Sequence, residues 1–170
     1  ILCTSYPRSR SDHWVPFMHA WARELAKTEN VYVVTSGGPN TVKYEVRDNV
    51  KIYRFNYFYP KNLQKLTYSG GMQESFKQEF LPKIQVPFFM LAFLIKSLRI
   101  AKNCDVINAH WVLSGLVAIP IKVLYKKPIV LTEHGGSIRG LPRWLNKFVL
   151  KRMDIITSAH QDMIDSIREM

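Results

Sequence analysis

The sequence predicts an α/β fold in which a mostly parallel sheet carries helices on both faces. Short apolar segments alternate along the chain with longer segments whose apolar residues recur at helical spacing. Parallel strands need helical crossovers of this kind between them. The 170 residues are 47% hydrophobic and 22% charged, which is typical of a globular chain that can bury a core. We therefore expect one domain of alternating strands and helices.

The N-terminal part of the chain predicts a strand, a helix and a second strand. Residues 1–5 have the apolar character of a short buried strand. A polar loop follows at residues 6–13, and apolar residues then recur at helical spacing over residues 14–25. Residues 31–36 are predicted to form the second strand. The helix then serves as the crossover connection that two parallel strands require.

The rest of the chain repeats this alternation. Further strands are expected at residues 51–58, 105–110, 128–133 and 154–158, and further helices at residues 87–101, 114–125, 142–151 and from residue 160 onward. Residues 60–85 predict a polar connection. Ligands of such folds bind beyond the carboxyl ends of the strands. The loops to examine for a site are therefore residues 6–13, 110–114 and 134–141.

The charge and composition of the chain limit the classes of binding partner and of structural site that are expected. The 24 Lys and Arg residues exceed the 13 Asp and Glu residues, so the net charge is +11. This excess favours an anionic partner, which is a nucleic acid, a lipid headgroup surface or a phosphorylated substrate. Two cysteines exclude a disulfide-rich scaffold, and no Cys or His spacing suits a structural metal site. The longest apolar run, residues 86–95, is too short to span a bilayer.

Several well-known motifs are absent from the sequence. It contains no G-x-G-x-x-G, no G-x-x-x-x-G-K-[ST], no H-E-x-x-H and no G-x-S-x-G. Dinucleotide-dependent dehydrogenases, P-loop proteins, zinc proteases of the H-E-x-x-H type and α/β-hydrolases are therefore disfavoured. No D-x-D pair offers a bridge to a metal-bound diphosphate.

One local pattern follows the predicted strand at residues 128–133. His134 ends this strand, and Gly135 and Gly136 then allow a sharp turn that brings backbone N–H groups close to an anion. Ser137 could cap a helical turn. The imidazole could hydrogen-bond a sugar hydroxyl or a developing charge. The alternative is a structural histidine that bonds a backbone carbonyl beside a simple Gly-Gly turn.

Two further patterns lie at strand ends. His110 and Trp111 place an imidazole beside an indole, which could form a stacking wall for a sugar ring or a base. The alternative is a half-buried aromatic residue at a sheet edge. In the first loop, Arg8 and Arg10 suit a phosphate and Asp12 suits a polyol. The alternative there is a solvated basic loop with a helix cap.

One predicted helix has a face that suits a membrane surface. Arg143, Lys147 and Lys151 recur every four residues and share this face, with Trp144 and Phe148 beside them. Such a helix could rest on anionic lipid. The alternative is an ordinary solvated face whose apolar stripe enters the core.

Several segments match, in order, the motifs of one protein family. The family often has Y-P followed by Gly-Gly or Gly-Asp where this chain has Tyr6-Pro-Arg8 with Ser11-Asp12. Its A-x-x-L-A and V-x-V-x-T motifs are similar to residues 22–26 and 31–35, respectively. Its D-[VI]-I-H-A-H motif is similar to residues 105–110, its P-[LV]-V-x-T-x-H-G motif to residues 128–135, and its R-A-D-x-[IV]-x-[AT]-x-S motif to residues 151–158. With these segments the chain resembles the N-terminal domain of a family 4 retaining glycosyltransferase. The similarity covers nearly the whole chain. No single motif identifies the family, but the occurrence of all of these motifs in the same order is specific for it.

The resemblance implies a Rossmann-like sheet that forms the N-terminal half of a GT-B fold. Residues 1–170 would be the N-terminal, acceptor-side domain, and a C-terminal donor-binding domain with an E-x7-E motif would be absent from this chain. The full-length protein would transfer a hexosyl group with retention from a nucleotide-sugar donor to a sugar or lipid-linked acceptor. The 170-residue chain alone would be inactive. The expected location is cytoplasmic, with peripheral contact on the inner face of the membrane.

The resemblance and the local patterns together nominate site residues. His134 would contact the donor sugar as the catalytic residue. The donor-binding residues would be Gly135, Gly136, Ser137, Ser11 and Asp12, and the acceptor-binding residues would be Tyr6, Arg8, Arg10, His13, His110 and Trp111. No metal and no cofactor are expected besides the nucleotide-sugar substrate. Two departures from the family pattern stand out: Ser11 replaces a glycine, and Gly136-Ser137 replaces the Ser-Asp that follows His-Gly.

Two other functions compete with sugar transfer. A non-catalytic Rossmann-like module that binds an anionic ligand or a membrane surface predicts a downstream sequence without an E-x7-E motif. A nucleic-acid-binding domain is suggested by the charge of +11. No nucleic-acid partner is expected, however, because the sequence contains no recognisable reader motif.

Overall fold

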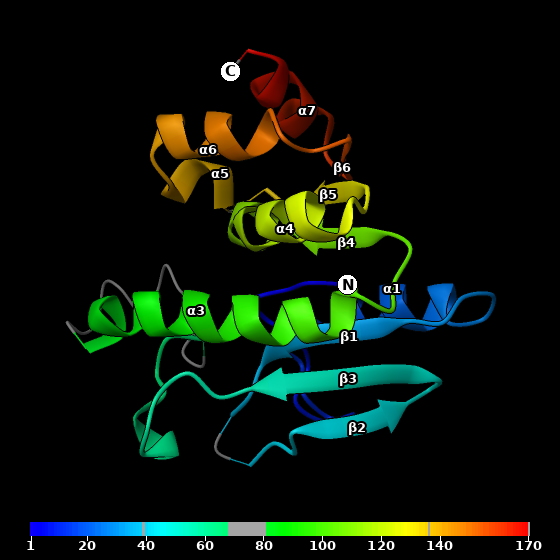
Figure 1. Cartoon of the computed structure of the whole chain (residues 1–170), viewed down its shortest axis with the longest axis vertical. Coiled ribbons are helices and arrows are strands. Elements are labelled where there is room, and N and C mark those ends of the chain that lie inside the picture. The colour runs from blue at the N-terminus through cyan, green and yellow to red at the C-terminus, as the bar shows by residue number, and fades with distance from the viewer. Residues whose placement is uncertain (39, 68–80, 136, 170) are drawn as a thin grey trace. The chain divides into compact units, whose positions relative to one another are not determined.

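The computed structural model describes residues 1–38, 40–67, 81–135 and 137–169, and Figure 1 labels its helices and strands. Contacts between residues divide the chain into two compact units. Unit 1 consists of Ile1 and residues 3–96, and unit 2 consists of Leu2 and residues 97–170. Both units contain strands and helices, so the α/β class predicted from the sequence is confirmed.

Unit 1 contains a three-stranded sheet in the order β1-β3-β2. β1 (Tyr32–Ser36) runs parallel to β3 (Val50–Phe55), whereas β2 (Tyr44–Arg47) is antiparallel to β3. The turn between β2 and β3 has left-handed backbone at Asp48 (φ 49°) and Asn49 (φ 62°), the conformation that a two-residue hairpin turn requires. β2 was not predicted, because its apolar side chains are exposed and its one buried residue is an arginine.

The first helix of unit 1 buries only a narrow face. α1 (Pro16–Leu25) begins with a proline in its first turn, and its buried residues are Met18 and Ala22. The larger apolar residues on and beside the helix are exposed: Trp14, Phe17, Trp21 and Leu25. The helix predicted from the spacing of these apolar residues is therefore confirmed, but most of their side chains face outward and do not enter the core.

The core of unit 1 forms between β3 and the long helix α3 (Leu81–Ala101). The rings of Phe89 and Phe93 are fully buried, and their centroids lie 5.2 Å and 5.0 Å from that of Phe55. α3 begins at Leu81, not at Pro87 as predicted, because the proline is accommodated inside the helix.

One face of α3 is apolar and exposed. Ile84, Phe88, Leu91 and Ile95 recur at helical spacing along it. Residues 83–101 have the length and the hydropathy of a membrane-spanning helix, on length and composition alone. The longest uninterrupted apolar run, residues 86–95, lies inside this longer helix, whose full length was not predicted from the sequence.

The predicted polar connection before α3 is partly ordered by side chains. A short 3-10 helix, η1 (Lys61–Leu63), lies within it. Two buried glutamines, Gln64 and Gln85, form hydrogen bonds with backbone groups of residues 57–65. Residues 68–80 of the predicted connection lie outside the described residues.

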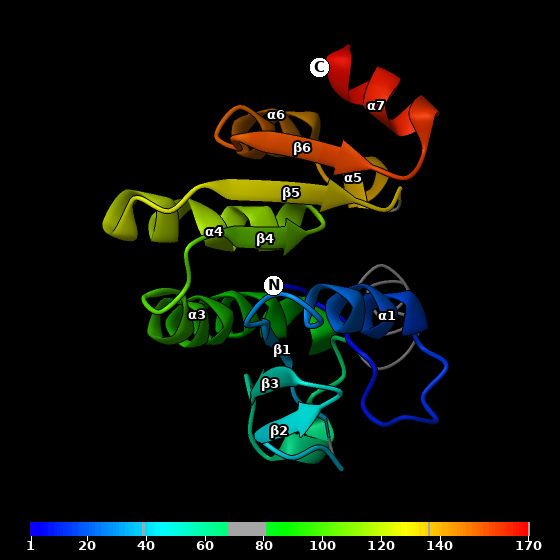
Figure 2. The same ribbon diagram turned by 90° about the vertical axis from the view of Figure 1, so that its right-hand side faces the viewer.

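Unit 2 contains three parallel strands, which lie side by side in Figure 2. β4 (Ile107–His110), β5 (Ile129–Glu133) and β6 (Ile155–Ser158) follow in that order across the sheet. All three were predicted to within two residues. The strand predicted at residues 1–5 is reduced to an isolated parallel bridge between Leu2 and Ala109.

Four helices accompany these strands, and they share a core. They are α4 (Val112–Tyr125), α5 (Ser137–Gly140), α6 (Arg143–Leu150) and α7 (Gln161–Arg168). The buried residues of the core cluster are Val112, Ile138, Val149 and Met163, which come from these four helices in turn. α4 packs against β4 and β5 on one side and against α6 on another. The start of α4 is therefore fixed beside the carboxyl end of the sheet.

Gly115 allows the close approach of α4 to its neighbours. A Cβ atom at this position would lie 2.8 Å from Val149 Cγ1 and 3.1 Å from Leu131 Cδ1. A larger residue here must therefore displace the side chains of Val149 and Leu131.

Candidate functional site

Two histidines meet at the carboxyl end of the unit 2 sheet. His110 ends β4, and His134 follows the last residue of β5. Their Nδ1 and Nε2 atoms, respectively, lie 2.9 Å apart. The ring of Trp111 lies beside them, with its centroid 5.3 Å from that of His134. His110 is fully buried and His134 is half-buried.

The two imidazole rings are joined edge to edge. Their planes differ by only 8°, and their centroids lie 5.2 Å apart. The centroid separation is close to the 2.9 Å N···N distance plus the radius of each ring, so both centroids and both nitrogen atoms lie nearly on one line. Because the two planes share this line and differ by only 8°, the rings are nearly coplanar. The hydrogen bond thus runs along the in-plane lone pair of the acceptor nitrogen, which is the favourable direction.

Asn108 holds His110 from the other side. Its Oδ1 lies 2.7 Å from His110 Nε2. Its Nδ2 donates to the carbonyl oxygen of Val130 at 3.2 Å and to Thr132 Oγ1 at 3.0 Å. The imidazole of His110 is therefore connected through one amide to the neighbouring strand β5.

Both histidines are held in the neutral form at neutral pH. Burial is the main cause, and the nearby His134 a smaller one, of the lowered pKa of His110, which is about 3. Burial also lowers the pKa of His134, and the positive charge of a protonated His160 contributes to that shift. Each ring thus offers one N–H donor and one acceptor nitrogen.

Backbone contacts fix the strand ends around the histidines. The Trp111 N–H donates to the Thr132 carbonyl at 3.1 Å, and Glu133 Oε1 accepts from the Val112 N–H at 2.9 Å. Glu133 is fully buried, and its Oε1 satisfies a backbone N–H of the first turn of α4 that has no partner within the helix. Trp111 itself has a left-handed backbone (φ 67°), an unusual conformation for a large residue. The chain therefore turns sharply between β4 and α4, directly beside His134.

The turn after His134 is only partly described. Gly135 has φ +100°, which a residue with a side chain rarely adopts. Gly136 lies outside the described residues. Ser137 begins α5, and its side chain also lies outside the described part of the structure. The sharp turn expected from the Gly-Gly pair is thus present at Gly135.

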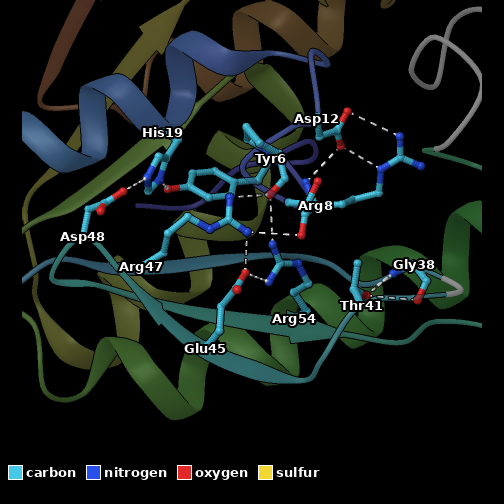
Figure 3. A network of polar contacts seen from close by, with 12 residues as sticks. Tyr6, Arg8, Asp12, His19, Gly38, Thr41, Glu45, Arg47, Asp48 and Arg54 are labelled. Carbon is cyan, nitrogen blue, oxygen red and sulfur yellow. Dashed lines mark hydrogen bonds and ion pairs between the residues drawn. The ribbon is translucent and has the colours of Figure 1, made fainter.

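A chain of hydrogen bonds in unit 1 begins at Tyr6 (Figure 3). The buried Tyr6 hydroxyl lies 2.7 Å from His19 Nδ1, and His19 Nε2 lies 2.8 Å from Asp48 Oδ2. Because a carboxylate only accepts, His19 Nε2 carries a proton and donates it to Asp48. Burial raises the pKa of Tyr6, and the hydrogen bond to His19 lowers the pKa of Asp48. The phenol is therefore held protonated as a donor.

The charged residues of the first loop form ion pairs, one within the loop and one with the turn between β2 and β3. Arg8 Nε donates to Asp12 Oδ2 at 2.8 Å, and this hydrogen bond is the main cause of the lowered pKa of Asp12. Arg10 pairs with Asp48 at 2.7 Å. Ser11 and His13 are exposed. The charged side chains of the loop are thus held in ion pairs, and Ser9 is exposed beside Ser11 and His13.

Two buried arginines support this loop from below (Figure 3). Arg47 donates to the carbonyl oxygens of Pro7 and Arg8, and Arg54 donates to that of Pro7 at 2.9 Å. Both guanidinium groups also bind Glu45 Oε1, at 2.7 Å and 2.6 Å. One carboxylate therefore offsets two buried cations, which leaves net positive charge beneath the loop.

A cavity of about 430 Å³ opens at the surface of unit 1. Its lining residues are Arg8, Ser9, Ser11, Asp12, Asn40 and Thr41. Each of these six side chains carries a hydroxyl, amide or charged group that can bind a polyol or an anion. Among the residues that the structure describes, no three His, Cys, Asp or Glu side chains gather closely enough to hold a metal ion.

Comparison with known proteins decides the family. The sequence model of Glycosyltransferase Family 4 matches residues 16–170. The chain belongs to glycosyltransferase family 4. No curated protein sequence matches it. The motifs noted at residues 22–26, 31–35, 105–110, 128–135 and 151–158 all lie within the matched range.

Two solved structures show the fold of this family 4 chain. Both are of sucrose-phosphate synthase from Thermosynechococcus elongatus. One matches with a TM-score of 0.60 and 17% identity over 89% of this chain and 76% of its own. The other matches with a TM-score of 0.59 and 16% identity over 87% of this chain, which spans 37% of its length. The fold is thus that of the GT-B glycosyltransferases, as the resemblance implied.

The predicted site residues fall into two groups, one in each unit. His110, Trp111 and His134 come together at the end of the unit 2 sheet, with Gly135 next to them. Tyr6, Arg8, Arg10, Ser11, Asp12 and His13 belong to the first loop of unit 1 or adjoin it. The donor and acceptor roles given to these residues remain predictions. The fully buried His110 contacts the site through His134, so any effect of His110 on a ligand is indirect.

The sequence patterns did not reveal several residues that organise these groups. They are Asn108 and Glu133 in unit 2, and His19, Glu45, Arg47, Asp48 and Arg54 in unit 1. Asn108 carried a signal, because it lies two residues before His110 and therefore on the same side of the strand. The residues in unit 1 are brought together only by the fold.

Proposed function

We propose that the full-length protein transfers a hexosyl group, with retention, from a nucleotide-sugar donor to an acceptor hydroxyl. The observation that carries this proposal is His134, which a hydrogen bond to His110 holds at the carboxyl end of β5 in a family 4 chain. In this proposal His134 contacts the donor sugar. The diphosphate leaving group is held by a part of the protein outside these 170 residues.

The chemistry of the site favours this role for His134. The sugar gains positive charge as the diphosphate departs, and a neutral imidazole does not repel that charge. The lowered pKa of His134 keeps the ring neutral. The indole of Trp111, at 5.3 Å, offers an apolar wall for one face of the sugar. Positioning and electrostatic stabilisation are then the contributions of these residues.

We propose that the acceptor binds at the first loop of unit 1. The cavity lined by Arg8, Asn40 and Thr41 offers charged, amide and hydroxyl groups to the hydroxyl groups of an acceptor. The exposed Trp14 and Trp21 continue from this loop along α1 and suit an apolar portion of the acceptor, as a lipid-linked sugar would have. The proposal needs no cofactor besides the nucleotide-sugar substrate.

The experiment that tests sugar transfer uses the full-length protein. It is incubated with UDP-, GDP- and ADP-sugars and with sugar or lipid-linked acceptors, and the anomeric configuration of the product is read by NMR. Transfer with the donor's configuration supports the proposal, and an inverted product contradicts retention. A full-length protein without an E-x7-E motif that transfers nothing from any donor would favour the non-catalytic module instead.

We further propose that the protein contacts the inner face of the cytoplasmic membrane through α6. Trp144 is 70% exposed and Phe148 is 40% exposed, although both are apolar. They lie among the exposed cations Arg143, Lys147, Lys151 and Arg152. An exposed aromatic pair inside a basic helical face fits the boundary between anionic headgroups and acyl chains.

The membrane proposal is tested by vesicle sedimentation of the 170-residue chain. We expect stronger binding to phosphatidylglycerol vesicles than to phosphatidylcholine vesicles, and loss of this preference in Lys147→Glu. Trp144→Ser should weaken binding to anionic vesicles, whereas Tyr59→Ser, which removes an exposed aromatic residue outside any basic helix, should not. Equal binding to both lipids, or equal effects of Trp144→Ser and Tyr59→Ser, would overturn the proposal.

A further inference from the structure

The orientation of the Asn108 amide is determined by its surroundings. Nδ2 donates to the Val130 carbonyl oxygen at 3.2 Å and to Thr132 Oγ1 at 3.0 Å. If the amide were turned over, its oxygen would face the Val130 carbonyl, and two acceptors would repel each other. Oδ1 therefore faces His110 Nε2, at 2.7 Å.

This orientation sets the tautomer of His110. An amide oxygen only accepts hydrogen bonds, so His110 Nε2 must carry a proton and donate it. The ring is fully buried and neutral, and a neutral imidazole carries one proton. His110 Nδ1 is consequently an acceptor.

The tautomer of His134 follows in the same way. His134 Nε2 lies 2.9 Å from the acceptor nitrogen of His110, so it must be the donor of that hydrogen bond. The near coplanarity of the rings, with 8° between their planes, fits an N–H bond directed along the lone pair. In the neutral ring Nδ1 is then the unprotonated nitrogen, and any group that contacts Nδ1 meets an acceptor.

We propose that Asn108 and His110 are positioning residues that fix the tautomer and the ring plane of His134. The series starts at the backbone of β5, crosses to β4 through Asn108 and His110, and returns to His134 at the end of β5. β5 thus supplies both the Val130 carbonyl that holds Asn108 and, directly after its last residue, the positioned His134. The catalytic meaning of the proposal rests on the proposed function, but the proton arrangement itself does not.

NMR spectroscopy of the 170-residue chain with ¹⁵N-labelled histidine tests the arrangement directly. We expect the bridging proton to show its one-bond coupling to His134 Nε2, and a smaller ¹⁵N–¹⁵N coupling across the hydrogen bond to His110 Nδ1. His110 should carry its own proton on Nε2. A bridging proton bonded to His110 Nδ1, or the absence of any coupling between the two rings, would overturn the proposal.

Two substitutions and a matched control extend the test. In His110→Phe the acceptor is lost, so the coupling should vanish and the Nε2–H signal of His134 should exchange faster with solvent. In His110→Gln the amide can still accept from His134 and donate to Asn108, so the slow exchange of the Nε2–H signal should be retained. His160→Gln removes a charge that contributes to the lowered pKa of His134 but changes neither ring of the hydrogen-bonded pair, so it should leave the coupling intact. Loss of the coupling in His160→Gln would contradict the assignment.

The catalytic consequence is measured separately in the full-length enzyme. His110→Phe should lower kcat about 10-fold or more with little change in the KM of the acceptor, because a misplaced ring costs transition-state contacts. His110→Gln should recover most of this loss. If the NMR arrangement holds but His110→Phe turns over normally, the positioning role is wrong. If wild-type enzyme transfers no sugar while the NMR arrangement holds, the proposed function is at fault.

Discussion

Three consecutive residues at the end of β5 make three different contacts. The Thr132 carbonyl accepts from the Trp111 N–H, Glu133 Oε1 accepts from the Val112 N–H, and His134 bonds His110. Side chains alternate along a strand, so Glu133 faces the start of α4 while its neighbours face the other side. A single register along β5 therefore aligns the helix start, the tight turn and the histidine pair.

The first prediction concerns His134→Ala in the full-length enzyme. We expect kcat/KM to fall by about 10²-fold or more, as when one positioned group that stabilises the transition state is removed from a reaction site. The stability loss should stay near 1–2 kcal/mol, roughly the cost of one hydrogen bond and a partner left unsatisfied in His110. Enzyme kinetics and thermal melting on the same variant measure both. A large loss of Tm with normal turnover in the folded fraction would assign His134 a structural role only.

The second prediction concerns the pH dependence of stability. In the native chain the pKa of His110 is about 3, whereas its ordinary value is 6.5. Between these values the unfolded chain binds a proton at this position and the native chain does not, so the free energy of unfolding falls as the pH falls from 6.5 toward 3. One such group contributes a slope of up to about 1.4 kcal/mol per pH unit. Urea unfolding at several pH values should show a smaller slope in His110→Gln, and an unchanged slope would contradict a buried neutral ring.

Sequence patterns could place the histidines but not their partners. His110 and His134 were found because apolar strands end at them, and carboxyl ends of parallel strands gather at one edge. Tyr6, His19 and Asp48 are joined by hydrogen bonds about as short as the one between the histidines. Tyr6, however, lies in a loop, His19 in a helix and Asp48 in a hairpin turn. No periodicity links such positions, so only the folded chain shows their contact.

The same physical reasons explain which elements were predictable. β4, β5 and β6 were predicted because short apolar runs are bounded by polar and proline residues. β2 was missed because exposed apolar side chains give it no pattern, although the Asp48-Asn49 pair is a hairpin signal. The first segment is apolar like a strand but pairs through only one bridge in unit 2. Apolar character predicts burial, and the length of a strand depends on its partners.

The third prediction concerns the packing of α4. Alanine favours helices over glycine by about 1 kcal/mol, but at Gly115 its Cβ would lie 2.8 Å from Val149 Cγ1. We expect Gly115→Ala to destabilise the chain by about 1–3 kcal/mol, because overpacking outweighs helix propensity here. The exposed Val123 on the same helix provides a control, and Val123→Ala should change stability by less than about 0.5 kcal/mol. Chemical unfolding measures both variants, and a stabilised Gly115→Ala would show that the helix can shift without cost.

At the scale of the whole molecule, the excess positive charge is distributed over different tasks. Arg47 and Arg54 are buried, and their guanidinium groups bind backbone carbonyls under the first loop. The cations of α6 are exposed. The net charge of +11 therefore combines structural and surface charges, and only the surface charges are available to an anionic partner.

The fourth prediction concerns donor binding by the 170-residue chain. If another part of the protein holds the donor, calorimetry with UDP-, GDP- and ADP-sugars should give dissociation constants no tighter than about 1 mM, or roughly −4 kcal/mol. Inorganic pyrophosphate at the same ionic strength is the control for attraction to the positive charge. A micromolar constant for one nucleotide sugar, with weak pyrophosphate binding, would show that these residues already contain the donor site.

The left-handed backbone at Trp111 has an optical consequence. It places an indole 5.3 Å from the centroid of His134, and a protonated imidazole quenches indole fluorescence while a neutral one does so far less. A chain in which Trp14, Trp21 and Trp144 are replaced by Phe keeps this indole alone. Its emission should stay bright at neutral pH and dim only below pH 6.5, since burial lowers the pKa of His134 from that value. The protein thus carries its own fluorescent indicator of the protonation of its candidate catalytic residue.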